Sequence, residues 1–396
     1  MIKMIKGGVT AAKGFCAAST AAGIKYQNRQ DMAMLYSEVP CAVAGTFTTN
    51  LVKAAPVKWD QKIVYESKKA QAVVINAGIA NACTGEEGMR YCRQTAEKVG
   101  ELLPVPEDQV LVASTGVIGM QLPMERICAG IEAMVPALSG ETESGHAAAQ
   151  AIMTTDTYEK EIAVEVMLGG VPVTIGGMCK GSGMIHPNMG TMLSFITTDC
   201  AISHEMLTDA LQENVKKTYN RVTVDGDTST NDMCVVLANG LAGNELIDWQ
   251  NEDYQAFCKA LNEINTRLAR QIAADGEGAT KLVTCTVRNS RSEETAERLA
   301  KAVVGSNLVK AAMFGADANW GRVLCAMGYS KAPFRPEYVD VAFESENGSV
   351  AVCEKGAALN FDEELAKKVL TANEVTIQID VHEGEHAATA WGCDLT

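Results

Sequence analysis

Aromatic side chains are scarce in this chain, at 5% of its 396 residues, and there are 10 prolines and five histidines. The core must therefore consist mainly of Ala, Val, Ile, Leu and Met, and proline-rich or collagen-like architectures are excluded. The longest apolar runs, such as Met167–Cys179, contain Gly, Pro and Thr and are too short to span a bilayer. With 47% hydrophobic and 21% charged residues, the composition is that of a globular protein long enough for two domains.

Basic residues are outnumbered, 34 against 49 acidic ones, which gives a net charge of −15 without any long Lys/Arg run. Nucleic acids and anionic membranes are therefore not expected as partners. The thirteen cysteines are scattered singly and form no C-x-x-C pair, as is typical of buried thiols in a reducing compartment. No apolar stretch follows Lys3 and Lys6, so we expect no secretory signal and a cytoplasmic protein.

Helical and strand-like segments alternate along the chain, which predicts a mixed α/β fold. Apolar residues recur at helical spacing in three segments, and alternating or short apolar runs favour strands in four others. The expected helices are 87–103, 252–274 and 293–304, and the expected strands are 110–114, 192–196, 282–287 and 375–381.

Two motifs resemble metal sites without meeting their requirements. The segment 382–386 fits H-E-x-x-H, but it follows an alternating strand and contains Gly384. On a strand, residues four apart are about 13 Å apart, too far to bind one zinc ion. The segment that begins at Asp225 starts like a calcium loop, but Thr230 replaces its glycine and Val236 its final glutamate. We therefore expect no metal site.

Common catalytic signatures are also missing. The sequence has no P-loop and no G-x-S-x-G motif, and the five histidines are isolated. A Ser-His-Asp triad is therefore not supported, and acid–base chemistry must depend on other groups.

Three segments rich in small residues are candidates for a site instead. The turn expected at Ser114–Gly119 could direct backbone N–H groups at an oxyanion, or simply end a strand. In Asp275–Lys281, Glu277 stands between two glycines and could contact a ligand amine, or lie in a solvated helix-end turn.

The third segment contains a glycine-rich loop that leads from Lys180 to Thr191. If the chain were cut before Thr191, the new α-amine, with a pKa of about 7.7–8.0, could activate the threonine hydroxyl. Gly190 tolerates the strained backbone that such a cleavage could use. A Gly-Thr pair alone is a weak signal.

An ordered set of motifs resembles the ornithine acetyltransferase (ArgJ) family over essentially the whole chain. The matching segments are 8–15, 81–85, 114–119, 154–157, 180–191, 224–232, 275–281, 314–322 and 390–395. The resemblance implies an α/β (α+β) fold with two lobes of mixed sheets and flanking helices, similar to ArgJ and DmpA proteins. It also implies a self-cleaving N-terminal nucleophile enzyme.

The activity implied by this resemblance is transfer of an acetyl group from N2-acetylornithine to glutamate in arginine biosynthesis. Acetyl-CoA is a possible second acetyl donor, and no cofactor is expected. Cleavage between Gly190 and Thr191 would give an α chain, 1–190, and a β chain, 191–396, which assemble as an α2β2 heterotetramer.

The resemblance also implies roles for individual residues. Thr191 would be the nucleophile that carries the acetyl group as an ester. Thr115 and Gly116 match oxyanion-hole positions, and Thr157, Lys180, Thr191 and Glu277 match substrate-contact positions. From their charges, we expect Lys180 to bind a carboxylate and Glu277 an amine.

The chain departs from the family pattern in two places. Gly190 stands where alanine is usual, and the sequence stops at Thr396, before the substrate-contacting tail of its relatives. The pocket would then close differently, or the sequence is truncated. The alternatives are a related N-terminal nucleophile amidase or aminopeptidase and a catalytically inactive binding protein.

Overall fold

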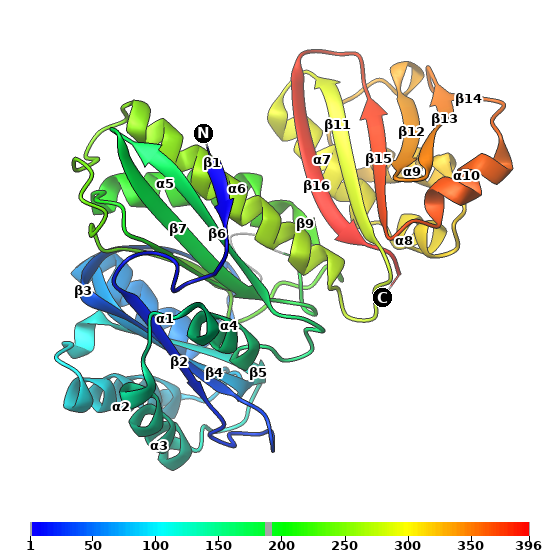
Figure 1. Ribbon diagram of the computed structural model, residues 1–396. Helices are drawn as coiled ribbons and strands as arrows, with labels where there is room; N and C mark the ends of the chain where they lie inside the picture. Colours follow the sequence, from blue (N-terminus) through cyan, green and yellow to red (C-terminus); the bar gives the residue numbers. More distant parts are fainter. Residues whose placement is uncertain (1, 187–191, 396) are drawn as a thin grey trace. The chain divides into compact units, whose positions relative to one another are not determined.

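The computed structural model describes residues 2–186 and 192–395 (Figure 1). The chain divides into two compact units. Unit 1 comprises Met1–Gly181, Pro187–Asn220 and Thr228–Leu268, and unit 2 comprises Ser182–His186, Arg221–Asp227 and Ala269–Thr396. Each unit therefore contains residues from both sides of position 190. The predicted α/β class, with mixed sheets and flanking helices, is confirmed.

The described part of unit 1 contains a nine-stranded mixed sheet. The strand order is β1-β6-β7-β8-β10-β3-β4-β5, and β2 pairs with β3. Only β4–β5 and β8–β10 are parallel pairs among these described strands. The strands are β1 (Ile2–Ile5), β2 (Phe15–Thr20), β3 (Met32–Phe47), β4 (Lys69–Ile79), β5 (Val110–Val117), β6 (Lys160–Leu168), β7 (Val171–Lys180), β8 (Leu193–Thr198) and β10 (Met233–Ala238).

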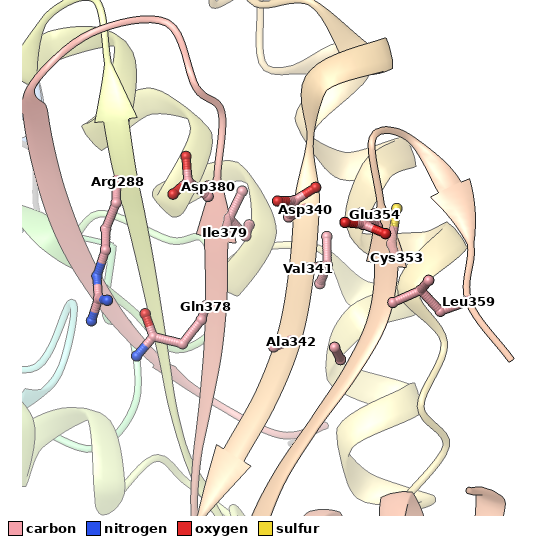
Figure 2. Close-up of a pocket in the computed structure, with 11 residues that line it drawn as sticks. Arg288, Asp340, Val341, Ala342, Cys353, Glu354, Leu359, Gln378, Ile379 and Asp380 are labelled. Atoms are coloured by element: carbon pink, nitrogen blue, oxygen red, sulfur yellow. The ribbon is translucent and has the colours of Figure 1, made fainter. Parts of the chain in front are cut away.

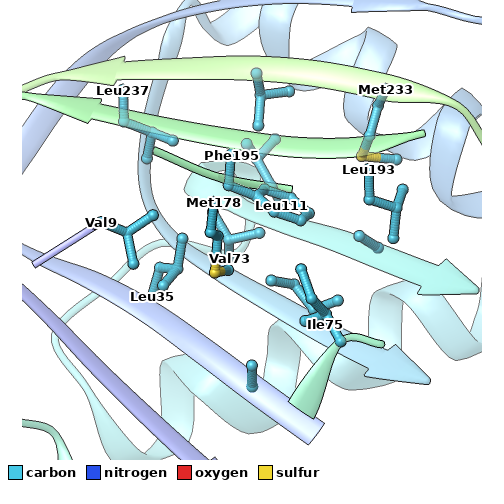
Figure 3. Packing of buried hydrophobic residues seen from close by; sticks show 14 of the residues in the cluster. Val9, Leu35, Val73, Ile75, Leu111, Met178, Leu193, Phe195, Met233 and Leu237 are labelled. Atoms are coloured by element: carbon cyan, nitrogen blue, oxygen red, sulfur yellow. The ribbon is translucent and has the colours of Figure 1, made fainter. Parts of the chain in front are cut away.

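Helices pack on both faces of this sheet because alternate residues of its strands are apolar on opposite sides. In β3, Ala33 and Leu35 belong to one buried cluster, part of which is shown in Figure 3, together with residues of α4. Met32 and Met34 belong to another, with residues of α2 and α3. The helices are α1 (Ala55–Lys62), α2 (Glu86–Leu102), α3 (Met124–Met134), α4 (Thr142–Ala151), α5 (His204–Lys217) and α6 (Glu252–Ala274), whose last residues belong to unit 2.

Unit 2 has a seven-stranded sheet in its described residues, in the order β14-β13-β12-β15-β11-β16-β9. Its core lies between one sheet face and the helices, where Val375, Ile377 and Ile379 of β15 are buried. The strands are β9 (Val222–Thr223), β11 (Leu282–Ser290), β12 (Asp340–Ser345), β13 (Gly348–Glu354), β14 (Ala357–Ala358), β15 (Glu374–Asp380) and β16 (His386–Cys393). The helices are α7 (Glu293–Val304), α8 (Asn307–Phe314), α9 (Trp320–Tyr329) and α10 (Glu363–Leu370).

Most predicted elements are confirmed, and two helices, α6 and α7, have the predicted bounds. The turn predicted at Ser114–Gly119 is wrong in part, because β5 continues to Val117. Thr115 and Gly116 remain in the strand since they pair with Ala77 and Gly78 of β4. All thirteen cysteines lie in the described residues and are free, and most of them are buried. No helix within the described ranges is long and apolar enough to cross a membrane.

Candidate active site

Lys180, the last residue of β7, lies in a buried charged cluster of unit 1. Its ammonium donates to the hydroxyl of Thr154 at 2.8 Å and lies 3.4 Å from the carboxylate of Asp156. The same carboxylate accepts from the ammonium of Lys160 at 2.8 Å and from the backbone N–H of Gly181 at 2.7 Å. The loop between α4 and β6 thus holds Lys180 at the strand end.

Asp156 must be ionised for this cluster to form. Burial alone would raise its pKa, but the positive charges of Lys180 and Lys160 and the hydrogen bonds from Lys160 and Gly181 hold the pKa below its ordinary value. The carboxylate of Asp156 thus contacts two ammonium groups. Lys180, whose side chain is 9% exposed, is a buried cation that Asp156 and Thr154 hold at the end of β7.

Thr157 follows Asp156 directly and is exposed in the same loop. The substrate-contact predictions Thr157 and Lys180 therefore lie on one short structural unit around Asp156. Thr154, Asp156 and Lys160 were not predicted as site residues. Thr154 and Asp156 did lie in one of the motifs that resemble the family, which was the only signal for them.

The strand ends that carry Thr115 and Gly116 are shaped by two glycines that face each other. Gly116 pairs with Gly78 and has a φ of +129°. A Cβ at Gly116 would overlap the backbone of Gly78, so no side chain fits there. Gly116 is exposed, and the Thr115 hydroxyl makes no hydrogen bond to any described residue. The Thr115 hydroxyl can therefore donate to a ligand that lies beside the exposed backbone of Gly116.

Asn231 fixes the backbone beside these residues. Its side-chain amide donates to the carbonyl oxygen of Ser114 at 2.8 Å and to that of Ala80 at 2.5 Å. The hydroxyl of Ser114 in turn donates to the side chain of Asn76 at 2.6 Å. The ends of β4 and β5 are thus joined by buried amides and a hydroxyl, which holds Thr115 in a defined place.

Asp232 connects this arrangement to the Lys180 cluster. It is buried, and its Oδ2 has no hydrogen-bond partner among the described residues. Burial raises the pKa of Asp232 well above its usual value, although Ser229 and the charge of Lys180 act in the opposite direction. Burial thus opposes the ionisation of Asp232, although the charge of Lys180 favours it.

Glu277 belongs to unit 2, in the loop between α6 and β11. Its backbone N–H donates to the carbonyl oxygen of Ser182 at 3.0 Å, and its carboxylate lies over Gly183. A Cβ at Gly183 would collide with that carboxylate, so this glycine leaves room for Glu277. The side chain of Glu277 is exposed, as a residue that binds a ligand amine requires.

Asp225 accounts for the segment that begins like a calcium loop. Its carboxylate accepts from the backbone N–H groups of Met184, Ile185 and Asp227, at 2.6, 2.9 and 3.0 Å. These bonds hold the segment that precedes position 187 against the end of β9. The Asp225 carboxylate is thus a loop anchor.

The H-E-x-x-H segment occupies the loop after β15 and the first residue of β16, His386, so the predicted strand end or turn is confirmed. A pocket of about 350 Å³ nearby, shown in Figure 2, is lined by Asp340 and Asp380 among others. The His382 ring lies 2.7 Å from Asp340, and Asp380 accepts from the Asn289 side chain at 2.6 Å. These carboxylates hold the loop, and none of the predicted site residues that the structure describes lines this pocket.

The predicted site residues therefore fall into three groups. Thr115, Gly116, Thr157 and Lys180 lie in unit 1, and Glu277 lies in unit 2. Gly190 and Thr191 lie outside the described residues, so the cleavage site and the nucleophile remain predictions. One matching motif, 224–232, contains Asp225, Asn231 and Asp232. The sequence alone assigned no role to these three residues, because their hydrogen bonds are visible only in the folded structure.

Comparison with known proteins identifies the family. The sequence profile of the ArgJ family matches residues 16–396. The Clostridium acetobutylicum "Arginine biosynthesis bifunctional protein ArgJ 1" is 51% identical over 382 residues, which cover 96% of this chain and 93% of that protein. The "Arginine biosynthesis bifunctional protein ArgJ" of Symbiobacterium thermophilum is 52% identical over 397 residues, covering 100% and 97%.

A crystal structure of "Arginine biosynthesis bifunctional protein argJ" from Bacillus halodurans shares 45% identity with a TM-score of 0.48. The match covers 51% of this chain and 93% of that one. The profile match and the identities over nearly the full length lead to one conclusion: this chain belongs to the ArgJ family.

Proposed function

We propose that this protein transfers the acetyl group of N2-acetylornithine to L-glutamate in arginine biosynthesis. Relatives about 50% identical over nearly the whole chain carry the name of an arginine biosynthesis protein. The observation that carries the proposal is the buried ammonium of Lys180, which Thr154 and Asp156 hold at the end of β7. Such a group suits the carboxylate that acetylornithine and glutamate have in common.

The reaction proceeds in two half-reactions through Thr191. Its hydroxyl oxygen attacks the acetyl carbonyl carbon, and its α-amine, freed by cleavage after Gly190, takes the hydroxyl proton. The C–N bond then breaks, and ornithine leaves with that proton on its amine. The amine of glutamate attacks the resulting ester in the second half, which gives N-acetylglutamate and restores the hydroxyl.

Thr115 and Gly116 stabilise the tetrahedral intermediates of both half-reactions. The hydroxyl of Thr115 is not used by any described residue, and Asn231 holds its strand end in place. Donors that are fixed before the reaction need no reorganisation when the negative charge develops, and the loss of one typically costs about 2.7–4 kcal/mol.

Lys180 and Glu277 recognise opposite charges on the substrates. Lys180 binds the α-carboxylate that both substrates carry. Glu277 binds the ammonium at the end of the acetylornithine side chain, and Thr157 contributes a hydroxyl to substrate binding. Because glutamate has a carboxylate where acetylornithine has this ammonium, Glu277 should favour the binding of acetylornithine and not that of glutamate.

The subunit composition, the location and the second acetyl donor are inferred from the family. We propose that the α chain, 1–190, and the β chain, 191–396, form an α2β2 heterotetramer in the cytoplasm and need no cofactor. The word "bifunctional" in the names of the relatives supports acetyl-CoA as a second acetyl donor for glutamate.

Acetyl transfer can be tested directly. Purified protein is mixed with acetylornithine and glutamate, and separately with acetyl-CoA and glutamate, and ornithine, N-acetylglutamate and acetate are quantified. We expect equal amounts of ornithine and N-acetylglutamate from the first mixture. Acetate without N-acetylglutamate would instead identify an amidase, and the absence of any product would contradict the proposal.

Lys180→Met should raise the KM of both substrates.

A further inference from the structure

The loop that carries Glu277 is short and is anchored at its far end in unit 2. It leaves α6 after Ala274 and enters β11 at Leu282. Within it, the N–H of Ala279 donates to the carbonyl oxygen of Gly276 at 2.8 Å. Glu277 lies at this tight turn, so the position of its carboxylate depends on what holds the two ends of the loop.

Asp394 holds the end that leads into β11. Its carboxylate accepts from the backbone N–H of Thr280 at 2.8 Å, from the Thr280 hydroxyl at 2.5 Å and from the N–H of Lys281 at 3.1 Å. Its own N–H donates to the carbonyl oxygen of Lys281 at 3.2 Å. Asp394 is fully buried, so water does not compete for these bonds.

Cys393, the preceding residue, supports the other end of the loop. A Cβ at Gly276 would lie 2.9 Å from the Cys393 sulfur, so the loop backbone packs directly on this residue. The buried ammonium of Lys310 donates to the Cys393 carbonyl oxygen at 2.9 Å and lies 3.1 Å from its sulfur. Cys393 and Asp394 therefore contact the loop on both sides of Glu277.

We propose that Asp394 is a positioning residue that places Glu277 for the ammonium of acetylornithine. This inference rests on the role of Glu277 in the proposed function. Without the Asp394 carboxylate, three donors at Thr280 and Lys281 lose their partner, although the backbone bonds of the loop and its contacts with Cys393 remain. Glu277 would then sample several positions, and only one of them binds substrate well.

The effect should be specific to one substrate. Asp394→Ala should raise the KM for acetylornithine about tenfold, the scale of a charge-assisted hydrogen bond that is lost or misplaced. The KM for glutamate should not rise, since Glu277 does not attract the side-chain carboxylate of glutamate. Asp394→Asn should restore most of the affinity, because its oxygen still accepts from both backbone N–H groups.

Three further variants distinguish a positioning effect from a general loss of stability. Thr280→Val removes one hydrogen bond at an exposed side chain, and should raise the KM for acetylornithine about threefold even if Asp394→Ala fails to fold. Glu277→Gln should raise the same KM, and Asp394→Ala added to it should have little further effect. Asp199→Ala is the matched control, because Asp199 also anchors backbone N–H groups, those of Lys13 and Thr174, at 3.1 and 2.8 Å.

The outcomes distinguish the positioning role of Asp394 from the proposed role of Glu277. If Glu277→Gln raises the KM for acetylornithine but Asp394→Ala and Thr280→Val leave it unchanged, the positioning role is wrong and the proposed function stands. The positioning role is also wrong if Asp199→Ala raises this KM as much as Asp394→Ala, because the effect would then reflect stability alone. If Glu277→Gln leaves the KM unchanged, the role of Glu277 fails and this inference fails with it.

Discussion

Three buried aspartates of unit 1 have pKa values shifted in different directions because their neighbours differ. Asp156 faces two ammonium groups, which keep it ionised in spite of its burial. Among the described residues, no cation forms an ion pair with Asp60 or Asp232, and burial raises the pKa of each well above the usual value. Asp60 accepts from the N–H of Val112 at 2.9 Å, and its Oδ2 has no partner among the described residues.

Asp60 should therefore lower the free energy of unfolding as the pH rises. The unfolded chain releases this proton above about pH 4, whereas the folded chain keeps it, so each further pH unit favours unfolding until the folded pKa is reached. Asp60→Asn cannot ionise and keeps an acceptor for Val112. Thermal unfolding at pH 4 and at pH 8 should show that the Tm of the variant rises relative to wild type as the pH increases.

A difference in Tm between Asp60→Asn and wild type that is independent of pH would contradict a raised pKa. Asp156→Asn is the opposite case and serves as a comparison, because the pKa of Asp156 is lowered. Its ionised form stabilises the fold above the ordinary pKa of an aspartate, and this contribution is lost as the pH falls. That variant should lose the most stability, relative to wild type, at neutral pH.

Thr115 allows a test of the oxyanion assignment. Thr115→Ala should lower kcat by about a hundredfold or more, the usual scale for one oxyanion donor, with little change in the binding of acetylornithine. The side chain has no described hydrogen-bond partner that its removal would leave buried and unpaired, so the fold should persist. Steady-state kinetics with both substrates decide the matter: a collapse of affinity at unchanged kcat would make the residue a binding element.

At the scale of elements, the sequence predicted helices better than strand ends. The bounds of α6 and α7 follow from apolar residues at helical spacing, which is a local property. The end of β5 does not, because Thr115 and Gly116 stay in the strand through pairing with β4, more than thirty residues away in the chain. The two facing glycines that make this pairing possible appear only in the fold.

The candidate site was predictable from motifs only in part. The sequence indicated Lys180 as a carboxylate-binding residue, but it gave no sign that Asp156 is shared with Lys160. The motif around Asp225 also contains Asn231 and Asp232, whose contacts run to residues far away in sequence. Hydrogen bonds of this kind depend on tertiary structure, and neither spacing nor propensity predicts them.

The pairing of strands in unit 1 makes a prediction about the cleaved protein. β8, which follows position 191, pairs with β7, which precedes it, and β10 pairs with β3. Cleavage at 190–191 would leave these ladders intact, so the fragments of about 20 and 22 kDa should elute together in native size-exclusion chromatography. They should separate only in denaturant. Fragments that separate under native conditions would contradict the pairing.

The whole molecule carries a charge of −15, yet the proposed substrates bear carboxylates. This is not a conflict, because salt at physiological ionic strength screens the interactions of surface charges beyond about 8 Å. The buried ammonium of Lys180 has a nearby partner that it shares, and its interaction with a ligand is screened much less. The local arrangement therefore determines what binds.

The central claim is that Thr191 carries the acetyl group, and mass spectrometry tests it most directly. Protein incubated with acetylornithine alone should gain about 42 Da on the fragment that begins Thr-Met-Leu-Ser, and peptide mapping should assign the gain to Thr191. Addition of glutamate should remove the added mass and yield N-acetylglutamate. An uncleaved chain that transfers acetyl groups, or an acetyl group on another residue, would contradict the account.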